Sequence, residues 1–403
     1  MRDPARVRVS GPLQPFAAGF TAELRGLGYQ QAAVVFQLQL LAHASRWLEA
    51  ERLGAGDLTS DVVERFLAAR RAAGYTNYVT TRAIEPLLGF LRGLGVAPVA
   101  WVAEPATAVE ALLARYGAYL AIERGLAAGT VWDYLHAVRP FLVQVGGDGE
   151  LDLQALTAAQ VTAFVVTRCP GQSRGAAKMT VTALRSLLGF LHVQGVIGRS
   201  LVGAVPSAAS WRLSGLPRAL EPEQVRGLLD SCDRLTPAGR RDFAVLTMLV
   251  RLGLRAGEVA GLGLDDIDWR VGELVVVGKG RRAERLPLPV DVGEAITAYL
   301  QDGRPTSAQD RALFQRVKAP HHGLTTGGIT QIVVSAARRA GVGQIHAHRL
   351  RHTAATQMLR AGAPLEEIGQ VLRHRQALTT AIYAKVDRDA LRQLARPWPG
   401  ARS

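Results

Sequence analysis

Residues 348–386 read HRLRHTAATQMLRAGAPLEEIGQVLRHRQALTTAIYAKV, and this stretch decides how the C-terminal half of the chain is interpreted. His348 and Arg351 are three residues apart, so a helix would place both side chains on one face. His374 follows in LRH, and Tyr383 comes nine residues later. These four residues therefore bring two imidazoles, a guanidinium and a phenol together in one short segment.

Two further cations precede this stretch. Arg255 occurs in GLRAGE, where it opens a helix, and Lys279 occurs in ELVVVGKGRRAERLPLP at 273–289. The second segment is typical of a β-hairpin, because a β-branched run, a glycine-flanked turn and a second strand ending at prolines follow one another. Lys279 would then lie at the hairpin tip. Apolar periodicity predicts helices at 221–233, 238–252, 291–301, 328–340, 349–361 and 365–373.

This set of side chains suits nucleophilic attack on a phosphodiester. Two guanidiniums and imidazole N–H donors can hold the negative charge that develops on the non-bridging oxygens without a metal. A tyrosine hydroxyl is a weak nucleophile at its ordinary pKa of about 10, so it needs a nearby base and a cationic environment. The departing alkoxide needs a proton, which a lysine can supply. Each residue alone has a plainer interpretation, as a solvated cation or a packed aromatic ring.

Four segments in order resemble the boxes of the tyrosine recombinase or phage integrase family, over about residues 216–390. GLRAGEVAGL (253–262) resembles the first-arginine box, with Glu258 at its acidic position, and VGKGRRAERLPLP resembles the hairpin that carries the catalytic lysine. HRLRHTAAT (348–356) resembles the His–x–x–Arg box, and VLRHRQALTTAIYAKV (371–386) resembles the closing His-and-Tyr box.

The resemblance implies a site-specific recombinase that cuts and rejoins DNA through a 3′-phosphotyrosyl intermediate, with no cofactor and no metal, and that serves a mobile genetic element. The implied catalytic residues are Tyr383, Arg255, Lys279, His348, Arg351 and His374, supported by Glu258. The arginines predicted to contact DNA are Arg281, Arg282, Arg349 and Arg373. The implied partner is double-stranded DNA at recombination core sites, bound by a homotetramer in the synapse.

Arg373 departs from the family pattern, which often has glycine immediately before the second histidine. Arginine cannot relax as glycine does, so either the local turn differs or Arg373 contacts DNA. His374 itself is intact, so the predicted activity stands.

Residues 15–205 are predicted to be helical and to contain an internal repeat. LLGFLRGLGV at 87–96 and LLGFLHVQGV at 187–196 match at seven of ten positions. LTSDVVERFL at 58–67 corresponds to LTAAQVTAFV at 156–165, and HASRWL corresponds to HAVRPFL, in the same order. Chance similarity between Leu- and Ala-rich helices is the alternative, but three ordered matches favour duplication of a helical domain.

These patterns predict a mainly α fold with a small β-hairpin. Helical domains are expected at 1–104 and 105–208, and a third domain at 209–403 after the Pro/Ser/Gly-punctuated stretch 204–218. The resemblance implies that the helical domains are SAM-like and that the third is the catalytic domain. The resemblance implies that the second domain binds the core site and forms a clamp with the catalytic domain. The first domain takes the place of an arm-site domain but looks like a second core-binding fold.

The first domain has two predicted roles. It either contacts DNA beside the core site or holds protomers together in the synapse. DNA contact is favoured, because Arg65, Arg70 and Arg71 gather at one predicted helix end and are followed by Tyr75 and Tyr78. An ordinary solvated helix end would look similar.

The composition agrees with a polyanionic partner. The formal net charge is +14 and the pI is about 10.6, with 29 basic and 19 acidic residues in 206–403. Neutralising phosphates releases condensed counterions, which favours binding of nucleic acid. Cys169 and Cys232 lack metal-ligand spacing, and no transmembrane span or signal peptide is recognisable. A reduced, cytoplasmic, nucleoid-associated protein of a bacterium is therefore expected.

Three other functions fit less well. A type IB topoisomerase uses a similar constellation, but the compact spacing of the boxes and the helical N-terminal domains disfavour it. A non-catalytic DNA-binding relative is disfavoured because all six expected catalytic residues are present. A metal-dependent nuclease using His348 and His352 lacks the glutamate of a zinc helix, and Arg349 and Arg351 would repel the cation.

Overall fold

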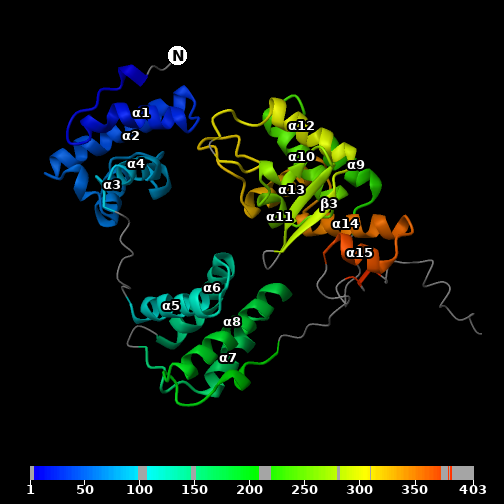
Figure 1. Cartoon of the computed structure of the whole chain (residues 1–403). Helices are drawn as coiled ribbons and strands as arrows, with labels where there is room; N and C mark the ends of the chain where they lie inside the picture. Colours follow the sequence, from blue (N-terminus) through cyan, green and yellow to red (C-terminus); the bar gives the residue numbers. More distant parts are fainter. Residues whose placement is uncertain are drawn as a thin grey trace, which may run out of the picture. The chain divides into compact units, whose positions relative to one another are not determined.

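The computed structural model describes residues 4–98, 107–146, 151–207, 219–278, 282–308, 310–373, 380 and 382–383. Within these ranges the chain is mainly helical and has one small antiparallel sheet, which confirms the predicted fold class (Figure 1). Met1–Ala100 and Gly215–Ser403 group into one compact unit, and Trp101–Ser214 forms a second. None of the described helices is long and apolar enough to cross a membrane.

The N-terminal segment forms four helices around its own hydrophobic core. They are α1 (Ala17–Gly26), α2 (Gln31–Ala50), α3 (Ser60–Ala72) and α4 (Thr81–Gly93), with single 3-10 turns at Pro4–Arg6, Gln14–Phe16 and Ala55–Asp57. In α2, Leu38, Leu41 and Leu48 are buried at helical spacing, so one face of this helix enters the core.

The second unit repeats this order of helices around a separate core. It contains α5 (Ala108–Ala118), the π-helical turn Tyr119–Glu123, α6 (Ala128–Gly146), α7 (Ala158–Arg168), α8 (Arg174–Val193) and the 3-10 turn Val202–Ala204. The π-helical turn directly continues α5.

Matching helix caps relate the two segments. Thr59 and Thr157 are the N-caps of α3 and α7, and each hydroxyl accepts a hydrogen bond from the backbone N–H three residues later. At the ends of α4 and α8, Gly95 and Gly195 have φ values of 70° and 68°. The backbone N–H of Val96 donates to the Leu91 carbonyl at 2.9 Å, and the same bond recurs one hundred residues later at the same distance. The repeated sequences therefore adopt the same local geometry, while the predicted domain limits remain a prediction.

The arginines of the first segment that were predicted to face DNA have partners within that segment. Arg65 is paired with Glu51, and Arg71 lies 3.8 Å from Glu64. Arg70 is buried, lies over the Tyr75 ring at 4.3 Å and donates to the Asn77 carbonyl. These contacts hold the loop after α3 against the helices, so the cluster also has a structural function.

The C-terminal segment carries the elements that position the site. Its helices are α9 (Pro222–Asp230), α10 (Pro237–Arg251), α11 (Ala256–Ala260), α12 (Val290–Asp302), α13 (Thr326–Arg339), α14 (Ala347–Arg360) and α15 (Leu365–Val371), with a 3-10 turn at Leu264–Asp266. The predicted helices agree with these bounds to within a few residues. Its core packs α10, α12, α13 and the N-terminal part of α14 against the sheet.

The sheet contains the predicted hairpin and one short additional strand. Strand β2 (Glu273–Val277) pairs antiparallel with β3 (Ala283–Pro287), with Val277 opposite Ala283, and β1 (Ile267–Asp268) pairs with the other edge of β2. Leu274 and Val276 are buried, whereas Val275 and Val277 between and after them are not, as a strand with one buried face requires. The Gly278 N–H donates to the Arg282 carbonyl at 2.9 Å and closes the turn.

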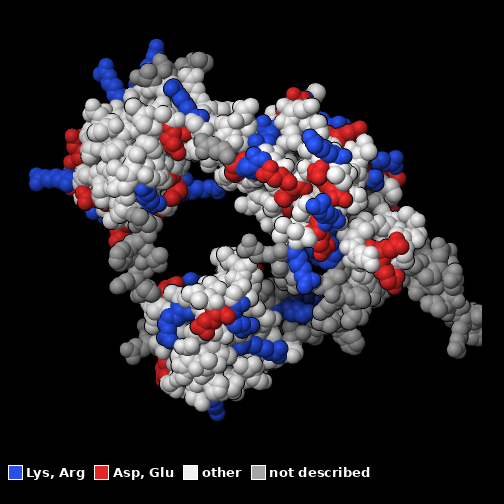
Figure 2. All heavy atoms as spheres, in the orientation of Figure 1, with Lys and Arg blue, Asp and Glu red and all other residues white. Residues whose placement is uncertain are grey.

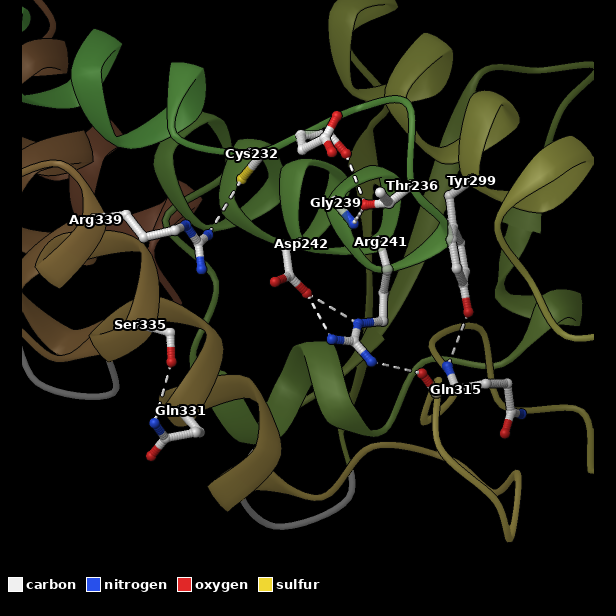
Figure 3. Close-up of polar contacts among 11 residues, drawn as sticks. Cys232, Thr236, Gly239, Arg241, Asp242, Tyr299, Gln315, Gln331, Ser335 and Arg339 are labelled. Carbon is white, nitrogen blue, oxygen red and sulfur yellow. Dashed lines mark hydrogen bonds and ion pairs between the residues drawn. The ribbon is translucent and has the colours of Figure 1, made fainter. Parts of the chain in front are cut away.

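Buried polar contacts fix the loops of this segment. Tyr299 is fully buried, and its hydroxyl accepts a hydrogen bond from the Gln315 backbone N–H at 3.0 Å (Figure 3). Arg241 pairs with Asp242 at 2.7 Å and donates to the Gln315 carbonyl. On the outer surface, by contrast, basic and acidic side chains are interspersed (Figure 2), and exposed ion pairs of this kind contribute at most about 1 kcal/mol each. Burial rather than surface charge therefore holds the framework.

Candidate active site

Three of the predicted site residues line one cavity. The cavity has a volume of about 330 Å³ and is bordered by Arg255, His348 and Arg351. Thr326, Thr330 and His346 complete its polar lining. The walls come from the start of α11, the start of α13 and the first turns of α14, so residues almost one hundred positions apart meet here.

Arg255 is held by the turn that precedes it and by Glu258. Gly253 has φ +59°, and a Cβ atom at this position would lie 2.6 Å from Leu372 Cδ2, so glycine is required for the turn. Arg255 is the N-cap of α11, where its backbone N–H donates to Glu258 Oε2 at 2.8 Å. Its guanidinium donates to Glu258 Oε1 at 2.6 Å while 41% of the side chain stays exposed. Arg255 is therefore oriented but still accessible.

Glu258 carries a second arginine on its other side. Arg373 Nη2 donates to Glu258 Oε2 at 2.7 Å, and the two side chains are only 3% and 4% exposed. Burial alone would raise the pKa of Glu258, but the hydrogen bond from the Arg255 backbone and the charges of Arg373 and Arg255 outweigh it and lower the pKa. Glu258 is thus an ionised carboxylate shared by two guanidiniums.

Arg373 is not on the surface, contrary to the predicted DNA contact. It has φ +55° at the end of α15, which is the conformation that glycine adopts easily and that costs another residue about 1 kcal/mol or more. The turn therefore has the backbone conformation that a glycine would adopt there, and the Arg373 side chain points inward to Glu258. The buried ion pair is the physical reason why DNA contact is not assigned to Arg373.

Arg351 is the most deeply enclosed cation of the site. It is 2% exposed, and it donates from Nη1 to the Gly253 carbonyl at 2.6 Å and from Nη2 to the Leu372 carbonyl. Burial, followed by the positive charge of Arg255, lowers the pKa of Arg351 to about 10, so it remains protonated at neutral pH. Arg351 connects α14 to the turn before α11 and to the end of α15.

Two histidines of α14 lead from the cavity to Tyr383. The rings of His348 and His352 lie 4.3 Å apart at an interplanar angle of 66°. His352 Nδ1 is 2.9 Å from the Tyr383 hydroxyl, and Tyr383 is 1% exposed. Partial burial and the charges of Arg351 and Arg255 lower the pKa of His348, although its side chain still reaches solvent. Burial raises the pKa of Tyr383, and the charge of Arg351 partly opposes this shift.

The remaining predicted residues are distributed as follows. Lys279, His374 and Arg281 lie outside the described residues. Arg282 is exposed, and Arg349 is partly exposed on α14. A Cβ atom at Gly278, the residue before Lys279, would be 3.9 Å from Glu258 Oε1. The end of β2 that precedes Lys279 therefore reaches the site.

Comparison with known proteins shows the family of the chain. The model of the phage integrase family matches residues 218–389, and that of the phage integrase N-terminal SAM-like domain matches 113–195. A Sinorhizobium fredii protein named as an integrase/recombinase, y4rA, is 42% identical over 97% of this chain and 95% of the relative. The chain belongs to the phage integrase (tyrosine recombinase) family. Tyrosine recombinase XerD of Listeria monocytogenes is 30% identical and covers 68% of this recombinase, with 94% of the relative matched.

Solved structures support the fold of the recombinase. The XerH site-specific recombinase, in a post-cleavage complex with difH DNA, aligns with a TM-score of 0.58 at 18% identity over 82% of this chain and 93% of that chain. Lambda integrase, as a dimer on a COC′ core site, aligns with a TM-score of 0.53 at 17% identity, covering 72% and 98%.

Glu258→Gln is expected to destabilise the recombinase by about 3 kcal/mol, because Arg373 would keep a buried charge without a counterion. Denaturant unfolding would measure the change. Glu223→Gln is the matched control, since this glutamate also pairs with an arginine three residues away, but both side chains are exposed by about 70%. Its effect should stay below about 0.5 kcal/mol. Equal effects of the two substitutions would contradict a buried ion pair at Glu258.

The stability of the recombinase is expected to fall with acidification from about pH 6.5. Burial, followed by the charges of His348 and Arg351, lowers the pKa of His352 to about 4. An unfolded histidine has a pKa of about 6.5, so the unfolded chain binds more protons than the folded chain between these two values. Lowering the pH therefore stabilises the unfolded state relative to the folded state. Below this window, stability is lost as the pH falls through the lowered pKa of Glu258.

Unfolding free energies measured at stepwise pH would test this expectation. His352→Gln should flatten the decline between about pH 6.5 and pH 4, because glutamine does not titrate. His322→Gln, at an exposed histidine that does not line the cavity, should leave the profile unchanged. A wild-type profile that is flat across the window would contradict a partly buried, neutral His352.

Sequence reasoning missed the role of two histidines. His352 was considered only as a metal ligand, yet it is the partner of the Tyr383 hydroxyl. Its position four residues after His348 on a helix was the available signal, because such residues share one face. His346 is the N-cap of α14 and lines the cavity, and no sequence pattern singled it out.

Proposed function

We propose that this recombinase breaks and rejoins DNA strands at specific sites by forming a 3′-phosphotyrosyl bond to Tyr383, and that it serves a mobile genetic element. The observation that carries the proposal is the cavity bordered by Arg255, His348 and Arg351. The ring of His352 lies between His348 and the Tyr383 hydroxyl and contacts both. A scissile phosphate in the cavity would meet two guanidiniums and an imidazole. These donors match the charge that grows on the non-bridging oxygens during attack.

The proposed roles of the residues follow from their positions. Arg255 offers an accessible guanidinium, and Arg351 retains further N–H groups beyond the two given to carbonyls. His348 donates to the phosphate, and Glu258 keeps Arg255 in place. Lys279 is assigned to protonate the leaving 5′ oxygen, and His374 is assigned as a further phosphate donor. Arg281, Arg282 and Arg349 are assigned to the DNA backbone.

The partner is double-stranded DNA at a recombination core site, approached by four copies of the chain. The net charge of +14 favours binding of DNA. The assembly of four copies is supported by lambda integrase, which has been solved as a tetramer bound to a Holliday junction. The Tn1549 transposon integrase, solved with a circular intermediate DNA, shares the fold with a TM-score of 0.51 and supports service to a mobile element. A recombinase of this kind would work on DNA in the bacterial nucleoid. We further propose that residues 1–104 are a duplicate of the core-binding domain at 105–208, supported by the repeated caps.

A suicide substrate would test the proposed reaction. Inverted repeats around a short spacer near the gene would supply the site, and a nick within the spacer traps the cleaved strand. The recombinase should form a protein–DNA adduct that persists on a denaturing gel. It should form equally in EDTA, because side chains rather than Mg²⁺ supply the positive charge. An adduct that requires added Mg²⁺ would contradict the proposed chemistry.

A further inference from the structure

The hydroxyl of Tyr383 contacts a histidine that has not been assigned a role in the reaction. His352 Nδ1 lies 2.9 Å from the hydroxyl oxygen, within the range of a hydrogen bond. The Tyr383 ring packs against Ala355, Ile368 and Leu372, which offer no proton acceptor on their side chains. With 1% exposure, Tyr383 cannot rely on bulk solvent to take its proton.

The other ionisable groups of the site, among the residues that the structure describes, are unsuited to accept this proton. Arg351 is a buried cation, and its charge acts on Tyr383. Glu258 is the buried carboxylate of the site, but Arg255 and Arg373 occupy it. His348 borders the phosphate cavity and contacts His352 with its ring. Among these described groups, His352 combines a nitrogen lone pair with direct contact to the reacting oxygen.

We propose that His352 is the general base that removes the proton of Tyr383 during strand cleavage. The inference rests on the proposed function and adds the group that activates its nucleophile. The Tyr383 O–H bond breaks and the proton moves to His352 Nδ1, while the phenolic oxygen forms a bond to phosphorus. The bond from phosphorus to the 5′ oxygen breaks, and that oxygen takes a proton from Lys279. Religation reverses each transfer, so His352 then acts as an acid.

The protonation state of His352 agrees with this role. Its lowered pKa, about 4, means that the imidazole is neutral at neutral pH and can offer an unprotonated nitrogen. The causes of this shift are burial, His348 and the positive charge of Arg351. A bound phosphodiester adds a negative charge beside Arg351 and so raises the basicity of His352. The base therefore becomes stronger when the substrate is in place.

The test combines His352→Gln with a more acidic nucleophile. In single-turnover cleavage of the suicide substrate, His352→Gln should be slower by roughly 10²-fold or more, because general bases contribute about 10²–10⁴-fold. Incorporation of trifluorotyrosine at position 383 supplies a phenol that ionises without help. This replacement should restore most of the lost rate in His352→Gln and change the wild-type rate little. DNA binding and thermal unfolding, measured in parallel, show that the variant is folded, and His322→Gln provides a control at an exposed histidine.

The outcomes distinguish a failure of the role of His352 from a failure of the proposed function. A Tyr383-dependent adduct that forms at the wild-type rate in His352→Gln would overturn the role of His352 and leave the proposed function intact. A slow variant that trifluorotyrosine does not rescue would also overturn it, since His352 would then only position the ring. A wild-type recombinase that forms no adduct would overturn both.

A measurement on the unmodified protein covers the case in which His352→Gln does not fold. Nitrogen NMR of 15N-histidine-labelled recombinase reports which ring nitrogen carries the proton. The proposal requires His352 Nδ1 to be an acceptor, with the proton on Nε2, and this signal should change in Tyr383→Phe. A proton found on Nδ1 would mean that His352 donates to the phenol, which contradicts its role as a base.

Discussion

Tyr383→Phe is expected to abolish the covalent protein–DNA adduct while site binding persists. The substitution removes one oxygen atom and preserves the ring that packs against Ile368 and Leu372. Without the hydroxyl there is no nucleophile, so the adduct should fall below detection rather than decrease by a modest factor. Stability should decrease by only about 1 kcal/mol, because the hydrogen bond to His352 is lost. Denaturing gels measure the adduct, and mobility shifts measure the binding.

Tyr299→Phe is the matched control for this experiment. Tyr299 is also a fully buried tyrosine of the same segment whose hydroxyl makes a hydrogen bond, in this case with the Gln315 backbone (Figure 3). Its loss should lower stability without preventing the adduct. An undiminished adduct in Tyr383→Phe would contradict the assignment of Tyr383 as the nucleophile.

Lys279→Ala is expected to slow strand cleavage by roughly 10²–10⁴-fold, the usual contribution of a general acid. The neighbouring Gly278 closes the hairpin turn beside Glu258, so the lysine follows a strand that ends at the site. A substrate with sulfur at the 5′-bridging position has a leaving group that needs little protonation. It should therefore be cleaved by Lys279→Ala nearly as fast as by the wild-type recombinase.

Two further variants make the result specific. Lys318→Ala removes a lysine that does not line the cavity, so this variant should cleave both substrates at the normal rate. Arg255→Ala loses charge stabilisation instead of a proton, so sulfur should not rescue it. Equal rescue of Arg255→Ala and Lys279→Ala would show that Lys279 is not the specific acid.

The sequence predicted those features that depend on local pattern. The spacing of His348 and Arg351 predicted a shared helix face, and both residues do border one cavity on α14. A β-branched run, a glycine-flanked turn and a second strand ending at prolines predicted the β2–β3 hairpin. The two-residue strand β1 was too short to produce such a pattern.

Features that depend on contacts between distant segments could not be predicted. The pairing of Arg373 with Glu258 joins residues 115 positions apart, and a positive φ at an arginine goes against local preference. The contact between His352 and Tyr383 similarly joins α14 to a segment that follows α15. Local pattern therefore identified the boxes, and tertiary packing decided which of their side chains touch.

The two carbonyl contacts of Arg351 affect how its variants must be interpreted. This side chain ties α14 to Gly253 and to Leu372, so its removal leaves two buried acceptors unpaired, at about 1–3 kcal/mol each. Arg351→Lys keeps the charge but cannot reproduce the fork of the guanidinium. The population of native molecules in such a preparation will therefore differ from that of the wild type. Turnover should be expressed per native molecule, counted by active-site titration, before any deficit is attributed to the phosphate.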